Sequence, residues 1–199
     1  MVYLTILLSL FLLIVAGLIW LRKAQYDAIH RNFLDLVDQY GGRVVRGGFA
    51  IRPKYTGKIK ENNVSISFSS EKKSKNETRR YYLSVFLQAS NVINFSILSL
   101  EWLGDTGKVD LGSRVIKNIF NKKYVIEVSD KHLMKKLDAK YIEKTVEKMH
   151  PFAYILVSRK GIILERLSHN LIADTEFQPI SQLLENLYSL TNISPVHSS

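Results

Sequence analysis

The sequence contains no cysteine. A chain without cysteine cannot form disulfides in any compartment, and it offers no thiolate as a metal ligand. The histidines lie far apart, and none belongs to an H-x-x-x-H or H-E-x-x-H pair. They are His30, His132, His150, His169 and His197. The sequence therefore predicts no metal site, and nothing in it indicates a cofactor.

Charge is absent from residues 1–21, "MVYLTILLSLFLLIVAGLIWL", in which only Thr5, Ser9 and Gly17 interrupt the apolar run. At about 1.5 Å per residue a helix of this length spans roughly 31 Å, which matches the hydrocarbon core of a bilayer at about 30 Å. A cleaved signal peptide would have a positive amino-terminal region, a shorter apolar core and a small-residue cleavage site. Since these features are missing, we expect residues 1–21 to be an uncleaved single-pass transmembrane anchor whose partner is the lipid bilayer.

Basic residues follow the apolar run directly, as Arg22, Lys23 and Arg31. The positive-inside rule then places the C-terminal domain in the cytoplasm. The formal net charge of +10 lies entirely after Leu21. A surface with this charge favours anionic partners.

A second helix pattern begins at Tyr26. Its apolar residues, spaced by one, three or four positions, are Tyr26, Ile29, Phe33, Leu36, Val37 and Tyr40. This spacing lines one face of a helix, so residues 22–42 are predicted to form an amphipathic connecting helix that docks on the domain. Gly41-Gly42 directly after the last periodic residue is typical of a helix C-cap, because glycine adopts positive φ freely.

Strand patterns follow this helix. In "NVSISFS", Val64, Ile66 and Phe68 alternate with serines, which is the period of a half-buried strand. The charged loop "SEKKSKNETRR" separates this segment from "YYLSVFLQA", which precedes "VINFSILSLEW". We expect residues 43–102 to form an antiparallel meander of five strands or fewer.

The second half of the chain mixes strands and helices. A strand "KKYVIEV" precedes Ser129 and Asp130, which are favourable N-cap residues for a helix over residues 131–149. "AYILVS" and "IILERL" flank the turn 159–161 as a hairpin, and Asp174 or Thr175 opens a last helix. The residues expected on the core faces of the two helices are Leu133, Leu137, Tyr141 or Ile142, Val146 and Met149, then Ile180, Leu183, Leu184, Leu187 and Leu190.

These elements predict an α+β fold, with an N-terminal transmembrane helix followed by an antiparallel sheet and about three packed helices. The domain is expected to cover residues 43–192, and the tail 193–199 is expected to be disordered. No period of 20 to 50 residues indicates internal repeats.

The stretch from Tyr40 to Lys60 is rich in glycine and in basic residues. It does not match a P-loop, because Gly57-Lys58 is followed by Ile59 in place of a hydroxyl residue. It does not match a dinucleotide loop either, since its first glycines close a helix. We expect a C-cap at Gly41-Gly42 and bends at Gly47-Gly48 and at Gly57.

The basic residues of this stretch are the candidate binding site. They are Arg43, Arg46, Arg52, Lys54, Lys58 and Lys60, offset only by Glu61. They form either a solvated face or a surface that binds anionic lipid headgroups, to which each basic side chain contributes about 1 kcal/mol. Nucleic-acid binding is disfavoured, because Phe49 and Tyr55 are too few aromatic residues for a stacking platform.

Catalytic signals are weak, and no catalytic residue is predicted. Ser158 and His169 could meet across a hairpin, but no G-x-S-x-G motif or oriented carboxylate accompanies them, which favours separate hydrogen-bonding roles. Asp105 and Asp110 share a loop with three glycines and could bind a cation. The ligand order of a calcium loop is missing, so a turn is the favoured interpretation.

Several segments together carry a family resemblance: "YGG", "RPKYTGKIKENNVSISFS", "LGD", "KKYVIEVSDKHLMKKL", "ILVSRKGIILERL" and "QPISQLLENLYSL". Over most of residues 26–192 the chain resembles a group of uncharacterised bacterial membrane-associated domains of unknown function. This resemblance implies an α+β module of strands, a central helix, a hairpin and a final helix. It supplies no catalytic residues.

The sequence thus favours a single-pass, membrane-anchored, non-enzymatic binding or assembly module with a basic surface near the membrane. Its expected partners are anionic lipid headgroups or a membrane protein. Two alternatives stay open, namely an enzyme that acts on a lipid or membrane-bound substrate and a nucleic-acid-binding domain. A deep pocket with convergent polar groups would favour the enzyme.

Overall fold

The computed structural model describes residues 2–48, 51–71, 79–91, 93–106, 115–129 and 131–191. Within these residues the chain forms the predicted α+β fold, with one nine-stranded antiparallel sheet in the order β1-β2-β3-β4-β9-β8-β5-β7-β6. The strands are β1 Arg43–Val45, β2 Lys54–Ile59, β3 Asn62–Glu71, β4 Arg80–Leu87, β5 Phe95–Ser99, β6 Val115–Ile119, β7 Tyr124–Val128, β8 Phe152–Ser158 and β9 Gly161–Ser168. The helices are α1 Val2–Tyr40, α2 Leu100–Thr106, α3 Lys131–Lys136, α4 Ala139–Glu147, α5 Leu171–Asp174 and α6 Phe177–Thr191. The predicted disordered tail lies outside the described residues.

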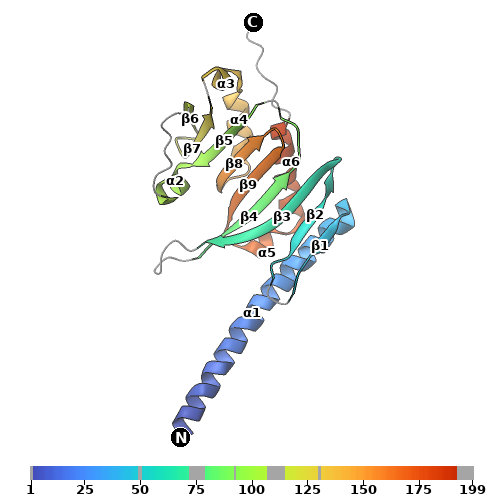
Figure 1. Ribbon diagram of the computed structural model, residues 1–199, viewed down its shortest axis with the longest axis vertical. Helices are drawn as coiled ribbons and strands as arrows, with labels where there is room; N and C mark the ends of the chain where they lie inside the picture. The colour runs from blue at the N-terminus through green and yellow to red at the C-terminus, as the bar shows by residue number, and fades with distance from the viewer. Residues whose placement is uncertain are drawn as a thin grey trace.

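The first helix, α1, projects from the domain with its amino-terminal half free of other elements (Figure 1). Its large apolar side chains up to Leu21 are exposed except for the half-buried Val15, and by length and composition the segment could cross a membrane. From Tyr26 onward the same helix enters the core, with Ile29, Phe33 and Leu36 fully buried. The predicted docking of this segment is therefore confirmed, and no break separates it from the apolar segment.

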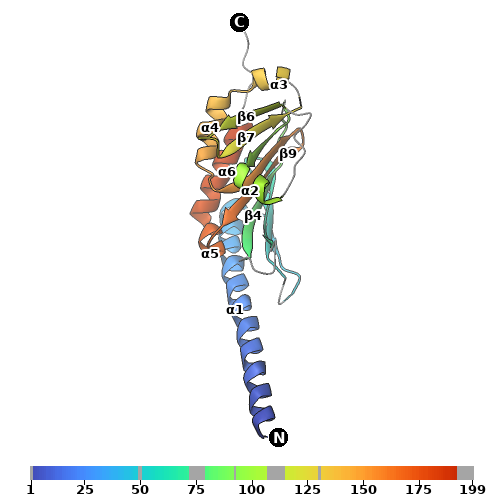
Figure 2. The same ribbon diagram turned by 90° about the vertical axis from the view of Figure 1, so that its left-hand side faces the viewer.

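Helices gather on one face of the sheet, as the edge-on view shows for α1, α4, α5 and α6 (Figure 2). The apolar stripe predicted for the last helix is confirmed in full, because the core residues of α6 are Ile180, Leu183, Leu184, Leu187 and Leu190. The alternation predicted for β3 is also confirmed. Val64, Ile66 and Phe68 are buried towards the helices, and the serines between them are half-buried.

The predicted meander over residues 43–102 is wrong at its last strand. Strands β1 to β4 pair in sequence order, but β5 pairs with β7 and β8. The place beside β4 is taken by β9 of the predicted hairpin. The β8–β9 hairpin is apolar on most of its positions, and a central place in the sheet buries more of that surface than an edge would.

The helix predicted over residues 131–149 is divided. α3 ends at Lys136, and Asp138 caps α4 by accepting hydrogen bonds from the backbone N–H groups of Lys140 at 3.1 Å and Tyr141 at 3.0 Å. An aspartate competes for nearby backbone donors in this way, which starts a new helix in place of continuing the old one. Leu137, Ile142, Val146 and Met149 are buried as predicted. The last helix also differs, since Asp174 ends α5 and α6 begins at Phe177.

The glycines of the stretch from Tyr40 to Lys60 have two different roles. Gly41 has a φ of +72°, and its N–H donates to the Val37 carbonyl at 2.8 Å, so the predicted C-cap is confirmed. Gly57 forms no bend, because it lies within β2 opposite Val64. A side chain there would collide with the hydroxyl of Tyr55, which crosses this position to donate to the Gly41 carbonyl at 2.9 Å.

Candidate functional site

The six predicted basic residues lie along the β1–β2 edge of the sheet. Measured along the axis of α1, they fall at different heights. Arg46 contacts Asp27 near the start of the docked part of α1, whereas Lys58 and Lys60 border a pocket with Tyr40 at its end. From Asp27 to Tyr40 a helix rises about 20 Å. The sequence therefore identified basic residues at both ends of the sheet edge, and the structure does not bring them into one patch.

Arg46 is held by Asp27. Its Nη1 lies 2.5 Å from Asp27 Oδ1, and the arginine side chain is only 18% exposed. The hydrogen bond from Arg46 is the main reason that the pKa of Asp27 is lowered, and Lys23 adds to this from the preceding turn of α1. This ion pair fastens the chain after β1 to α1.

Arg52 binds the end of β3. It donates to the Phe68 carbonyl at 3.3 Å and to Ser70 Oγ at 2.6 Å, and its guanidinium lies 5.6 Å from the centre of the Phe68 ring. Burial pushes the pKa of Tyr26 upward, but hydrogen bonds from Arg22 and Arg52 outweigh it, and the net shift is downward. Arg52 therefore joins β3 to the same turn of α1 that Arg46 holds.

Further basic residues at the start of β4 lie near the same turn of α1. The ring centres of Tyr26 and Phe68 lie 5.6 Å apart, and Phe68 pairs with Leu83, so the start of β4 lies near the start of the docked part of α1. Arg79 precedes this strand and is exposed, and Arg80 pairs with Glu71 across the β3–β4 ladder. We call this set the anchor-side rim: Arg22, Lys23, Arg46, Arg52, Lys54, Arg79 and Arg80. Asp27 and Glu71 offset part of its charge.

Sequence reasoning missed Arg79 and Arg80 as site residues. Both end the segment "SEKKSKNETRR", whose composition indicates only a charged loop. The signal that could have found them is the hairpin formed by β3 and β4. In an antiparallel hairpin the end of the first strand pairs with the start of the second. The residues that open β4 therefore lie level with the end of β3.

Lys58 and Lys60 belong to a different surface. They border a pocket of about 360 Å³ between the end of α1, the β2–β3 turn and α6. Lys60 Nζ lies 4.7 Å from the centre of the Tyr188 ring, and Tyr40 and Ser181 share a hydrogen bond of 2.7 Å. Arg43 is exposed on β1 opposite Thr56, between the two heights.

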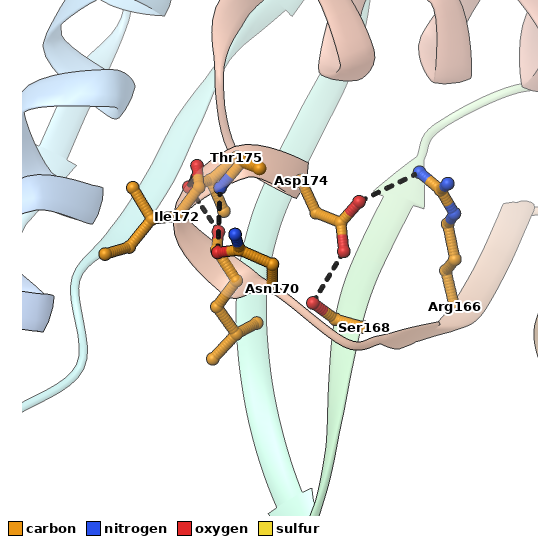
Figure 3. Close-up of polar contacts among 8 residues, drawn as sticks. Arg166, Ser168, Asn170, Ile172, Asp174 and Thr175 are labelled. Carbon is orange, nitrogen blue, oxygen red and sulfur yellow. Dashed lines mark hydrogen bonds and ion pairs between the residues drawn. The ribbon is translucent and has the colours of Figure 1, made fainter.

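A polar turn at α5 fixes α1 against the sheet. Asn32 of α1 donates to the Ile172 carbonyl at 2.8 Å and to Thr175 Oγ1 at 3.1 Å. Ser168 at the end of β9 donates to Asp174 at 2.6 Å, and Asp174 faces Arg166 from the other side (Figure 3). These contacts tie α1 to the strand end and to the start of α6 at the same time.

The candidate catalytic pair is not assembled. Ser158 lies at the turn of the β8–β9 hairpin, where its Oγ donates to the Gly161 carbonyl at 3.0 Å. His169 follows the other end of β9, about 23 Å away at 3.3 Å per residue. The predicted hydrogen-bonding role of Ser158 is confirmed, and the two side chains cannot act together.

Metal-ligand clusters are also absent from the described residues, in which no three His, Asp or Glu side chains come together. The loop with Asp110 lies outside these residues. The structure does show one histidine contact that the sequence did not indicate, between His150 Nδ1 and the Tyr124 hydroxyl at 2.5 Å. Burial, and then the charge of Lys123, lower the pKa of His150.

Comparison with known proteins finds a structure with a similar fold and no matching family. No protein-family model matches the chain, and no curated protein matches it. A crystal structure does match: the mycobacterial trehalose monomycolate transport factor A, TtfA, with a TM-score of 0.52 and 10% sequence identity. The chain shares its fold with TtfA. The match covers 85% of this chain and 98% of the TtfA chain.

Proposed function

We propose that this chain is a single-pass, membrane-anchored, non-enzymatic binding module whose anchor-side rim faces anionic lipid headgroups on the cytoplasmic side. The observation that supports it most is the continuity of α1, which is apolar and exposed up to Leu21 and belongs to the core from Tyr26. A helix of this kind holds the sheet at a fixed height above the bilayer without a flexible linker.

The position of the rim adds to this proposal. Arg22 and Lys23 follow the apolar segment directly, and Arg46 and Arg52 are bound to the next turn of α1. Lys54 and Arg79 are exposed. Each basic side chain near an anionic surface contributes about 1 kcal/mol, so the rim can hold the domain against headgroups even though Asp27 and Glu71 offset part of its charge.

The likeness to TtfA is compatible with this role. That protein is described as a transport factor for trehalose monomycolate, a description that names no reaction. By analogy of fold alone, we include an accessory role in the transport of a lipid within the proposed function.

The proposal can be tested by measuring the distance of two residues from the bilayer. The chain has no cysteine, so Ile51→Cys beside the rim and Glu61→Cys at the β2–β3 turn each give one fluorophore site. The full chain is placed in nanodiscs with a quencher on the lipid headgroups. Position 51 should be quenched more strongly than position 61, because α1 separates the two heights by about 20 Å.

Anionic lipid should increase the quenching at position 51, and added salt should remove that increase over a Debye length of about 8 to 10 Å. Lys54→Gln with Arg79→Gln should abolish the increase. The control is Lys117→Gln with Lys135→Gln, which removes the same charge from exposed residues outside the anchor-side rim. In this variant the increase in quenching should remain. Equal quenching at positions 51 and 61 would contradict the anchoring, and an unchanged increase in the rim variant would contradict lipid binding.

Cytoplasmic orientation has its own test. Lys117 is exposed on β6, so Lys117→Cys provides a single accessible thiol. In intact cells this thiol should resist an impermeant reagent and react only after the membrane is opened. Ready labelling of intact cells would place the domain on the outside.

A further inference from the structure

A cavity of about 200 Å³ lies between the end of α4, strand β9 and the first half of α6. Its polar lining consists of two cations and three side-chain amides, and its lining residues include no carboxylate. These polar residues are Lys148, Arg166, Gln178, Gln182 and Asn186.

The lining is built from two regular elements and a helix end. Gln178, Gln182 and Asn186 recur every four residues on α6, which places them on one face of the helix. Arg166 lies on the helix-covered face of β9, in line with the buried Ile162 and Leu164. The side chain of Arg166 is only 21% exposed, and a cation so largely removed from water needs a partner.

Two donors of this lining have no partner in the described part of the chain. Arg166 Nε and Asn186 Nδ2 are both buried and make no hydrogen bond. Most buried polar groups in proteins are hydrogen-bonded, so two orphaned donors in one cavity indicate an acceptor that belongs there. Lys148 stands at the edge of the cavity, exposed, and adds a positive charge.

Asp174 leaves Arg166 only partly satisfied. Its Oδ1 lies 3.8 Å from Arg166 Nη1, which is beyond hydrogen-bond distance, and its Oδ2 accepts a hydrogen bond from Ser168 at 2.6 Å (Figure 3). The guanidinium therefore keeps a donor without a hydrogen-bond partner among the described residues, on the side of the cavity.

We propose that this cavity binds the phosphoryl group of a small ligand. The lining offers donors from β9, from α6 and from the end of α4, so an oxyanion with oxygens in several directions fits it better than a planar carboxylate does. Its volume lies below the range of roughly 300–1,000 Å³ that suits drug-sized molecules, which limits the bound part to a group of headgroup size. The same phosphoryl chemistry could come from free phosphate, a soluble phosphate ester or a lipid headgroup.

This proposal does not rest on the anchor-side rim, so the two can fail separately. The experiment uses the full chain in dodecyl maltoside micelles, which carry neither phosphate nor charge. Titration calorimetry measures the binding of inorganic phosphate, glycerol 3-phosphate and dihexanoyl phosphatidic acid, with acetate as the planar comparison. All three phosphoryl compounds share the group that the site should recognise, and the tightest of them identifies its source.

The decisive variant is Gln182→Glu, which adds a carboxylate at an exposed position of the lining and leaves the core untouched. Its matched control is Gln39→Glu, the same change at an exposed residue of α1 outside this cavity. Phosphate should bind the unmodified chain at one site, at least tenfold more weakly in Gln182→Glu and within twofold in Gln39→Glu. Lys54→Gln with Arg79→Gln should bind phosphate normally.

Three results would overturn the proposal. The first is the absence of saturable binding of any phosphoryl compound to the unmodified chain. The second is equal affinity in Gln182→Glu and in the unmodified chain, and the third is acetate binding as tightly as phosphate. Melting temperatures of both glutamate variants are measured beside the titrations, so that a loss of affinity is assigned only to folded protein.

Discussion

Truncation of Phe33 to alanine tests whether helix α1 is part of the folding core. Phe33 is fully buried, and its ring lies 6.5 Å from that of Tyr55 on β2. Removal of a buried phenylalanine side chain costs about 3–5 kcal/mol. Because a domain is stable by only about 5–15 kcal/mol, Phe33→Ala should remove a large part of the free energy of unfolding.

Leu34 provides the matched control on the next residue of the same helix. Its side chain is 42% exposed and lies outside the buried stripe. Substitution of an exposed residue usually changes stability by no more than about 0.5 kcal/mol, so Leu34→Ala should unfold close to the unmodified chain. The pair separates loss of core packing from a general effect on helix α1.

Unfolding can be followed in urea with the full chain in micelles, by the fluorescence of Trp102. Its ring lies 5.4 Å from Tyr154 on the domain side of the molecule. The other tryptophan, Trp20, lies in the apolar segment and is replaced by phenylalanine so that it does not contribute. If Phe33→Ala and Leu34→Ala unfold at the same urea concentration, α1 is not part of the cooperative unit, and the inference of a rigid anchor fails.

Two further predictions concern the stretch between α1 and β3. Gly57→Ala should lower the free energy of unfolding measured in urea, because its new methyl group meets the Tyr55 hydroxyl and stands 3.0 Å from the Gly41 carbonyl oxygen. In a Tyr55→Phe background the loss of stability should be smaller. An equal loss in both backgrounds would show that the hydroxyl is not the obstacle. Since the pKa of Asp27 is lowered in the folded state, its ion pair with Arg46 contributes stability above the unfolded pKa of about 3.9, and this contribution is lost as pH falls through the folded pKa. Melting temperatures below about pH 5 should therefore fall more steeply in the unmodified chain than in Asp27→Asn, and parallel curves would contradict the coupling.

Local periodicity carried most of the correct predictions. The stripe of α6 and the alternation of β3 are set by neighbours in sequence, and both faces are the ones expected. The same holds for the docked face of α1 from Tyr26 to Leu36. Side chains at these spacings must lie on one side of their element, whatever the rest of the fold does.

The order of strands could not be obtained in this way. Alternation in β5 shows that one face is buried, but it does not show which strand lies beside it. That choice depends on the later β8–β9 hairpin, which is apolar enough to occupy the centre of the sheet and so separates β5 from β4. The short strand β6 was missed as well, since "VIKNI" exposes most of its residues.

The candidate site shows the same limit. Arg46 and Lys60 are 14 positions apart in a stretch that looked uniformly basic, yet they lie at opposite ends of the sheet edge. Which end each occupies depends on the reversal at Gly41-Gly42 and on the pairing of β2 with β1. The cavity at Arg166 was not foreseen because its lining comes from three separate elements, and none of its segments resembles a known motif.

Under the proposed anchoring, the unbroken helix α1 would also act as a lever on the domain. Transmembrane helices are tilted by about 20° on average, and a tilt is the usual response to a bilayer thinner than the apolar segment. Over the rise of about 20 Å between Asp27 and Tyr40, such a tilt moves the far end of the sheet sideways by about 7 Å. Because Asn32, Arg46 and Arg52 fasten the sheet to α1 near its base, the sheet follows this movement as one body. Under the proposed anchoring, the thickness of the surrounding bilayer would set the direction in which the pocket beside Tyr40 and Lys60 points.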